Sequence, residues 1–151
     1  MKVPYIDLVG QHRKLRPELL RAFNRVLGRG DFILGREVSE LEERFAKYCG
    51  TKYAVALNSG TDALFLALKV MGVGKGDEVI TVPNSFIASA SSIVTTGARP
   101  VFCDVDPDQN MNPQKLEDAI SKRTKAIMPV HLTGKIADMN AIMKIARKHK
   151  L

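Results

Sequence analysis

Cysteine is scarce in this sequence, and neither a metal-ligand spacing nor a long apolar run occurs in it. The 151 residues contain two cysteines, Cys49 and Cys103, which lie far apart along the chain. Such a pair argues against a disulfide framework and against a cysteine-ligated zinc site. No two carboxylates or histidines have a spacing that demands a metal ion. We therefore expect a reduced, cytoplasmic protein without a bound metal.

Signals for membrane insertion are also lacking. No stretch approaches the ~20 consecutive apolar residues of a transmembrane helix. The first residues have no apolar signal core, because Pro4 and Asp7 interrupt them. We expect no membrane partner.

Acidic residues are fewer than basic ones, 16 against 23, which gives a net charge of +7. An excess of this size could indicate a nucleic acid or another anionic partner. Much of it lies at residues 11–16 and 144–150, within stretches whose apolar residues have helical spacing. No zinc-finger, basic-zipper or aromatic-basic RNA motif accompanies them. We interpret both stretches as solvated helix faces and expect no nucleic-acid partner.

Helix-like and strand-like segments alternate along the chain. Strands are expected at residues 53–57, 78–82, 100–103 and 125–130. Helices are expected around residues 19–27, 38–48, 64–71, 86–96, 113–120 and 137–149. Gly28 and Gly30 are the expected stops of the first helix, Gly50 of the second and Gly72 of the third. This alternation predicts an α/β fold with a mostly parallel sheet flanked by helices.

Ser59, Gly60 and Thr61 lie between a predicted strand and a predicted helix. A helix N-terminus exposes unpaired backbone N–H groups and carries about half a positive charge. Glycine lets a phosphate approach the backbone, and the two hydroxyl groups can add donors. A simpler interpretation is that Ser59 and Asp62 form a capping box without any ligand.

Two further candidates, Phe86 and His131, follow predicted strands. In open parallel sheets, ligands bind at the carboxyl ends of the strands. Phe86 could stack on a flat cofactor ring, or it could be a core residue beneath its own helix. His131 could hydrogen-bond a cofactor or substrate, serve as an acid or base, or have a structural role.

The glycine-rich run at residues 72–76 does not fit a nucleotide-binding loop. It follows a helix and precedes a strand, whereas the dinucleotide fingerprint needs the opposite order. We interpret it as a helix stop and turn. Ser59 likewise lacks the flanking glycines of a nucleophile elbow.

Taken in order, eight segments resemble the DegT/DnrJ/StrS family of sugar aminotransferases, which are fold-type I enzymes that use pyridoxal 5′-phosphate. The segments are residues 5–8, 32–38, 45–50, 59–64, 76–81, 83–88, 97–102 and 129–132. The likeness covers nearly the whole chain. It implies that residues 1–35 form an N-terminal segment and first helix. Residues 36–151 would form the N-terminal part of the three-layer, cofactor-binding large domain.

The resemblance also implies roles for single residues. Ser59, Gly60 and Thr61 would hold the cofactor phosphate, Phe86 would stack on the pyridine ring, and His131 matches a histidine near the cofactor. Family members move an amino group from an amino acid, usually glutamate, to a keto group on a nucleotide-linked sugar. The sugars are destined for surface polysaccharide or a natural product. These enzymes are usually homodimers, so a homodimer is expected of the parent protein.

Two parts of the family pattern are missing from the sequence. The lysine that bonds to the cofactor and the aspartate that pairs with the pyridinium nitrogen are expected beyond Leu151. We therefore expect no catalytic residue within this chain and no transamination by the chain alone. The alternative is a non-catalytic phosphate- or nucleotide-binding α/β module, or a remnant of an enzyme.

The segment at residues 53–57 bears on stability. In the family's sheet, this strand is separated from the next three by strands that come later in sequence. Without those strands it would leave an unpaired apolar edge, which promotes aggregation. We expect a chain that is marginally stable, or that associates with itself or with a complementing fragment.

Overall fold

A computed structural model describes residues 3–151. They form two compact units, one that ends at Ala56 and one from Leu57 to Leu151. The expected boundary between residues 35 and 36 lies within the first unit, and that division stays a prediction. Within residues 3–151, no helix combines the length and the apolar character that crossing a bilayer requires.

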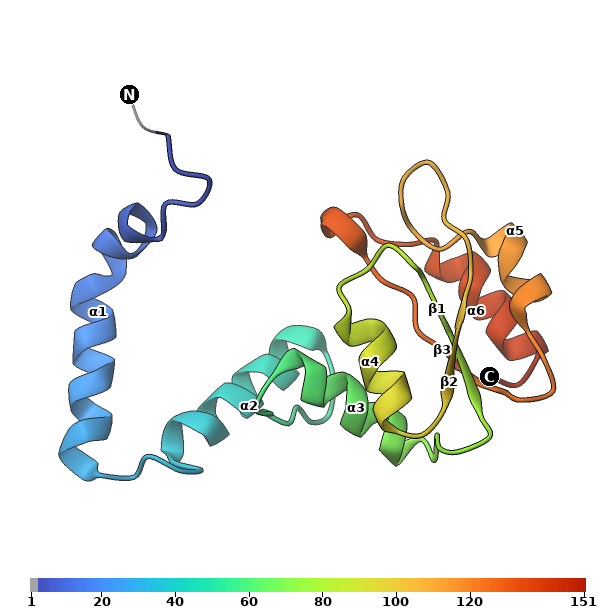
Figure 1. Ribbon diagram of the computed structural model, residues 1–151. Helices are drawn as coiled ribbons and strands as arrows, with labels where there is room; N and C mark the ends of the chain where they lie inside the picture. Colours follow the sequence, from blue (N-terminus) through green and yellow to red (C-terminus); the bar gives the residue numbers. More distant parts are fainter. Residues whose placement is uncertain (1–2) are drawn as a thin grey trace. The chain divides into compact units, whose positions relative to one another are not determined.

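The first unit contains two helices, α1 (Leu8–Arg29) and α2 (Arg36–Cys49) (Figure 1). Both end at a predicted stop, Gly30 with φ of 75° and Gly50 with φ of 66°, whereas Gly28 lies inside α1 and is not a stop. A residue without a Cβ adopts this left-handed conformation at low cost. The side chain of Asp7 caps the start of α1. No residue of α1 is buried, and large apolar side chains such as Leu19, Phe23 and Leu27 are exposed.

The strand predicted at residues 53–57 is not formed, so this prediction is wrong. Tyr53 and Val55 are 73% and 74% exposed. The backbone N–H of Ala56 donates to the carboxylate of Glu42 at 2.8 Å rather than to a neighbouring strand. A strand needs a partner for its backbone groups, and no strand described within residues 3–151 pairs with this segment.

The second unit alternates helices and strands. Its main elements are α3 (Gly60–Val70), β1 (Glu78–Thr81), α4 (Ala88–Thr95), β2 (Arg99–Phe102), α5 (Pro113–Leu116), β3 (Thr124–Ile127) and α6 (Met139–Lys148), with the short 3₁₀ helices η1 (Glu117–Ala119) and η2 (Leu132–Gly134). They confirm the predicted helices and the three later predicted strands, with ends that differ by a few residues. Gly72 and Gly76 have φ of 75° and 95° in the turn between α3 and β1, as predicted.

The three strands form a parallel sheet in the order β2–β1–β3 (Figure 1). Successive residues of β1 face opposite sides of the sheet, because side chains alternate along a strand. Val79 lies in a core with residues of α3 and α4, and Ile80 lies in a second core with residues of α5 and α6. Helices therefore flank both faces of the sheet, which confirms the predicted three-layer α/β arrangement.

A buried carboxylate joins the amino ends of the three strands. Glu78, the first residue of β1, is 2% exposed. Arg99, the first residue of β2, donates to it at 2.5 Å, and Arg123, directly before β3, donates to it at 2.8 Å. The Ser121 hydroxyl donates at 2.6 Å. The bond from Ser121, followed by the bonds from the two arginines, lowers the pKa of Glu78 to about 2.

Replacing Glu78 by Gln should lower the free energy of unfolding at neutral pH, because the two arginines lose their shared negative partner. The pKa of Glu78 is about 2 in the folded chain, against an ordinary value of 4.5. The contribution of its charge is therefore fully present above about pH 5 and is lost as the pH falls toward about 2.

Urea unfolding of both proteins at about pH 7, 4 and 2.5 tests this expectation. The difference between wild type and Glu78→Gln should narrow as the pH falls. A difference that stays constant across this range would contradict a stabilising role for the charge.

The exposed segment at residues 53–57 should promote self-association. Val55→Lys places a charge on this apolar segment and should shift the chain toward monomer in sedimentation velocity at rising concentration. Val70→Lys is the matched control, because Val70 is 88% exposed at the end of α3. A wild-type chain that stays monomeric and melts sharply and cooperatively would count against this expectation.

Candidate functional site

The carboxyl ends of the three parallel strands meet at one edge of the sheet, the upper edge in Figure 1. The chain leaves β1 toward Phe86 and leaves β3 toward His131. Ligands of open parallel sheets bind at this edge. The structure therefore places two of the predicted residues on loops of one sheet edge.

The N-terminus of α3 carries the three predicted phosphate-binding residues. Ser59 is its N-cap: the Ser59 Oγ accepts the N–H of Asp62 at 3.1 Å and donates to Asp62 Oδ2 at 3.0 Å. The capping interaction considered from the sequence is thus present, and it engages the Ser59 hydroxyl. Gly60 and Thr61 are exposed, and a Cβ added to Gly60 would meet no atom within 4 Å. The backbone at Gly60 is therefore open to an approaching ligand.

Phe86 lies in the loop between β1 and α4 and is 76% exposed. Its interpretation as a core residue is therefore wrong. The Phe86 carbonyl accepts the N–H of Ser89 at 3.0 Å, and the hydroxyl oxygens of Ser85 and Ser89 lie 2.7 Å apart. These bonds fix the backbone at the start of α4 and leave the aromatic ring free to stack.

His131 lies after β3 and is also exposed. Its Nδ1 accepts the backbone N–H of Ala137 at 3.2 Å. This bond assigns the proton of the neutral ring to Nε2. His131 can therefore donate a hydrogen bond from Nε2 while Nδ1 stays bound to the segment before α6.

Two asparagines that the sequence did not single out connect these loops through a turn at residues 105–111. Asn84 Nδ2 donates to the carbonyl of Gln109 at 2.9 Å, and Asn110 Oδ1 accepts the N–H of Leu132 at 3.3 Å. Asn110 is 2% exposed. The Asp, Pro and Asn residues of this stretch indicate a turn. The two hydrogen bonds join residues that are 22 and 25 positions apart in the sequence, so a local sequence pattern could not reveal these contacts.

The structure joins the Phe86 and His131 loops through this turn. Among the hydrogen bonds of residues 3–151, however, none joins the predicted phosphate-binding residues 59–61 to either loop directly. The connection is made by packing, since α3 and α4 contact each other on one face of the sheet.

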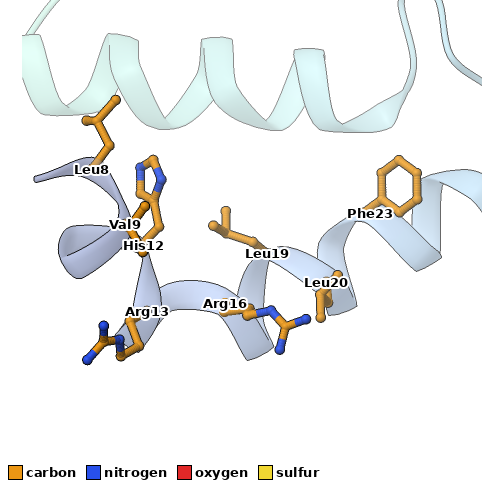
Figure 2. A pocket seen from close by; sticks show the side chains of 8 residues that line it. All are labelled: Leu8, Val9, His12, Arg13, Arg16, Leu19, Leu20 and Phe23. Carbon is orange, nitrogen blue, oxygen red and sulfur yellow. The ribbon is translucent and has the colours of Figure 1, made fainter.

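Two sizeable cavities lie away from these residues. A cavity of about 570 Å³ runs along α1, and Figure 2 shows Leu19 and Phe23 beside it together with the basic side chains of Arg13 and Arg16. Another, of about 600 Å³, lies at the amino edge of the sheet near Arg99. Neither is lined by any of the predicted site residues.

Comparison with known proteins identifies relatives over almost the whole chain. UDP-2-acetamido-2-deoxy-3-oxo-D-glucuronate aminotransferase of Pseudomonas aeruginosa is 45% identical over 148 residues, which cover 97% of this chain and 41% of the relative. A crystal structure of Streptomyces venezuelae DesV has a TM-score of 0.96 and 44% identity, and the match covers 99% of this chain and 41% of DesV. Bacillus subtilis ntda with bound cofactor PMP has a TM-score of 0.94 and 36% identity, and covers 99% of this chain and 35% of ntda.

The chain thus spans about two fifths of the length of the P. aeruginosa relative and of DesV. The model of the DegT/DnrJ/EryC1/StrS aminotransferase family matches residues 13–151. This range contains seven of the eight segments that carry the resemblance in the sequence. The chain belongs to the DegT/DnrJ/EryC1/StrS aminotransferase family.

Proposed function

We propose that this chain is the part of a sugar aminotransferase that binds the phosphate and the ring of pyridoxal 5′-phosphate. In the whole protein, an amino group would pass from an amino acid, usually glutamate, to a nucleotide-linked keto-sugar. The observation that carries the proposal is the exposed N-terminus of α3, where Gly60 leaves the backbone open beside the exposed Thr61. Family membership and a related structure with bound PMP support it.

The residues at this N-terminus suit a phosphate. The 11 residues of α3 align enough peptide dipoles to place about half a positive charge there. The N–H groups of Gly60 and Thr61 belong to the first turn, which has no partners within the helix. The one carboxylate of this turn, Asp62, accepts hydrogen bonds from Ser59 Oγ at 3.0 Å and from Asn58 Nδ2 at 2.9 Å. The Asp62 carboxylate is thereby bonded to Asn58 and Ser59, the two residues before the helix.

The loops at the sheet edge would hold the cofactor ring. The bound cofactor supplies an electron sink for amino transfer. Phe86 would stack on the ring, which contributes about 0.5–1.5 kcal/mol beyond the burial of its surface. His131 would donate from Nε2 to an acceptor on the cofactor or the substrate. The resemblance implies a catalytic lysine and aspartate beyond Leu151, so the residues of this chain would bind and orient the cofactor rather than transfer protons.

The other properties of the whole protein are proposed from the family. The P. aeruginosa relative is by name an aminotransferase of a UDP-linked keto-sugar, and we propose a substrate of the same class. The product would enter a surface polysaccharide or a natural product. The whole protein would be a homodimer in the cytoplasm.

Replacing Gly60 by Leu should weaken binding of pyridoxamine 5′-phosphate by more than about tenfold, because the side chain would occupy the space through which phosphate reaches the backbone. The fold should tolerate the change, since an added Cβ meets no atom within 4 Å. This ligand has no aldehyde and therefore cannot react with surface lysines. Its intrinsic fluorescence reports binding in a titration.

Gly28→Leu is the matched control, because an added Cβ on this glycine of α1 also meets nothing within 4 Å. It should leave the affinity at the wild-type value. Pyridoxamine, which lacks the phosphate, should bind wild type and Gly60→Leu equally. Equal binding of the phosphorylated ligand by wild type and Gly60→Leu would refute the phosphate site.

The 151-residue chain should not catalyse amino transfer from glutamate. The expected rate of 2-oxoglutarate formation with added pyridoxal 5′-phosphate is that of the free cofactor, because no matched motif of the chain supplies the lysine. A coupled assay for 2-oxoglutarate measures this rate. A rate well above the free-cofactor value would show that one of the chain's own lysines acts as catalyst and would overturn the assignment beyond Leu151.

A further inference from the structure

A buried polar side chain lies between the two loops that carry Phe86 and His131. Asn110 is 2% exposed, and both ends of its side-chain amide are occupied. Its Oδ1 accepts the N–H of Leu132 at 3.3 Å, and its Nδ2 lies 3.4 Å from the carbonyl of Lys135. Buried amides are retained in this way when they fix the relative positions of segments that are distant in sequence.

We infer that Asn110, together with Asn84, is a positioning residue that sets where Phe86 and His131 stand relative to the cofactor ring. The inference rests on the proposed function, because it concerns the same site. It assigns no contact between either asparagine and the cofactor.

The turn that carries Asn110 is itself anchored. Val105 and Met111 form an antiparallel bridge across it, and Met111 is 1% exposed in the core beneath. The N–H of Asp106 donates to the carbonyl of Asn110 at 2.9 Å. Gln109 closes the turn with φ of 68°, a conformation that non-glycine residues rarely adopt. The turn is therefore a rigid support rather than a free loop.

The His131 loop is attached to this support at two points. Asn110 holds Leu132, the residue directly after His131, and its amide also reaches Lys135. The Lys135 ammonium lies 3.0 Å from the carboxylate of Asp108 in the same turn. The backbone on the carboxyl side of His131 is thus held by the 105–111 turn.

The Phe86 loop is attached on the other side. Asn84, two residues before Phe86, donates to the carbonyl of Gln109 at 2.9 Å. Because Gln109 directly precedes Asn110, one turn spans both loops. The spacing between Phe86 and His131 is therefore set by the two asparagine side chains.

The phosphate-binding segment does not depend on this support. The Ser59 hydroxyl and the Asp62 carboxylate bond to each other and to the N-terminus of α3, and neither bonds to residues 105–111. Loss of Asn110 or Asn84 should therefore affect binding of the cofactor ring and leave binding of phosphate alone unchanged.

The test compares pyridoxamine 5′-phosphate with inorganic phosphate on the 151-residue chain. Asn110→Ala and Asn84→Ala should each weaken binding of the first by about five- to tenfold and leave the affinity for the second unchanged. Asn84 is exposed, so its variant is expected to fold even if Asn110→Ala does not. Hydrogen exchange at the Leu132 amide should accelerate in Asn110→Ala, because that N–H loses its acceptor.

Asn112→Ala is the matched control. Asn112 caps α5 through a bond from Gln114 N at 2.8 Å and does not bond to either loop. Its variant should lose stability while keeping wild-type affinity for pyridoxamine 5′-phosphate. Equal weakening in all three variants would reduce Asn110 and Asn84 to structural residues and overturn the inference.

The outcomes separate the inference from the proposed function. If wild type binds pyridoxamine 5′-phosphate and both asparagine variants bind it equally well, the positioning role is refuted and the function stands. If wild type binds neither ligand, the proposed function fails and the inference fails with it.

Discussion

The carboxylate of Glu78 holds the starts of three strands at one edge of the sheet. The backbone of Glu78 pairs with Arg99 of β2 and with Thr124 of β3, and its carboxylate accepts hydrogen bonds from Arg99 and Arg123. A shift of one residue in either outer strand would move one of the two guanidinium groups away and leave the buried charge with fewer partners, which is unfavourable. The register is thereby fixed at the amino edge. The strands are only four residues long, and the pairing of β1 with β2 runs from Glu78 without interruption, whereas the register of β1 with β3 shifts directly after Glu78.

Local sequence patterns were sufficient for most elements of the second unit. Helical spacing and glycine stops gave α3 and the turn after it, and short apolar runs gave β1, β2 and β3. The segment at residues 53–57 has the same apolar character and failed as a strand. A run of apolar residues indicates that a segment can join a sheet as a strand. Whether it does so depends on a partner strand elsewhere in the chain. Tyr53 and Val55 have no such partner among the described residues and remain exposed.

In the candidate site, too, features that depend on neighbouring residues could be predicted from the sequence, whereas features that depend on residues distant in sequence could not. The position of Ser59, Gly60 and Thr61 at a helix N-terminus could be predicted from the sequence, because a helix N-terminus is a local feature. The exposure of Phe86 could not be found, since the core and ring-stacking interpretations predict the same residue type at that position. Asn110 and Glu78 were missed for a different reason. Each is a polar residue whose partners lie tens of residues away, so its burial is visible only when the strands are assembled.

The hydrogen bond at His131 has a chemical consequence for the sheet edge. Nδ1 accepts the N–H of Ala137, so the lone pair of this nitrogen is occupied and the ring is attached to the backbone that leads into α6. The proposed role of His131 in binding would therefore fall to Nε2, whose N–H can reach a lone pair on a bound molecule while the ring stays attached to the chain.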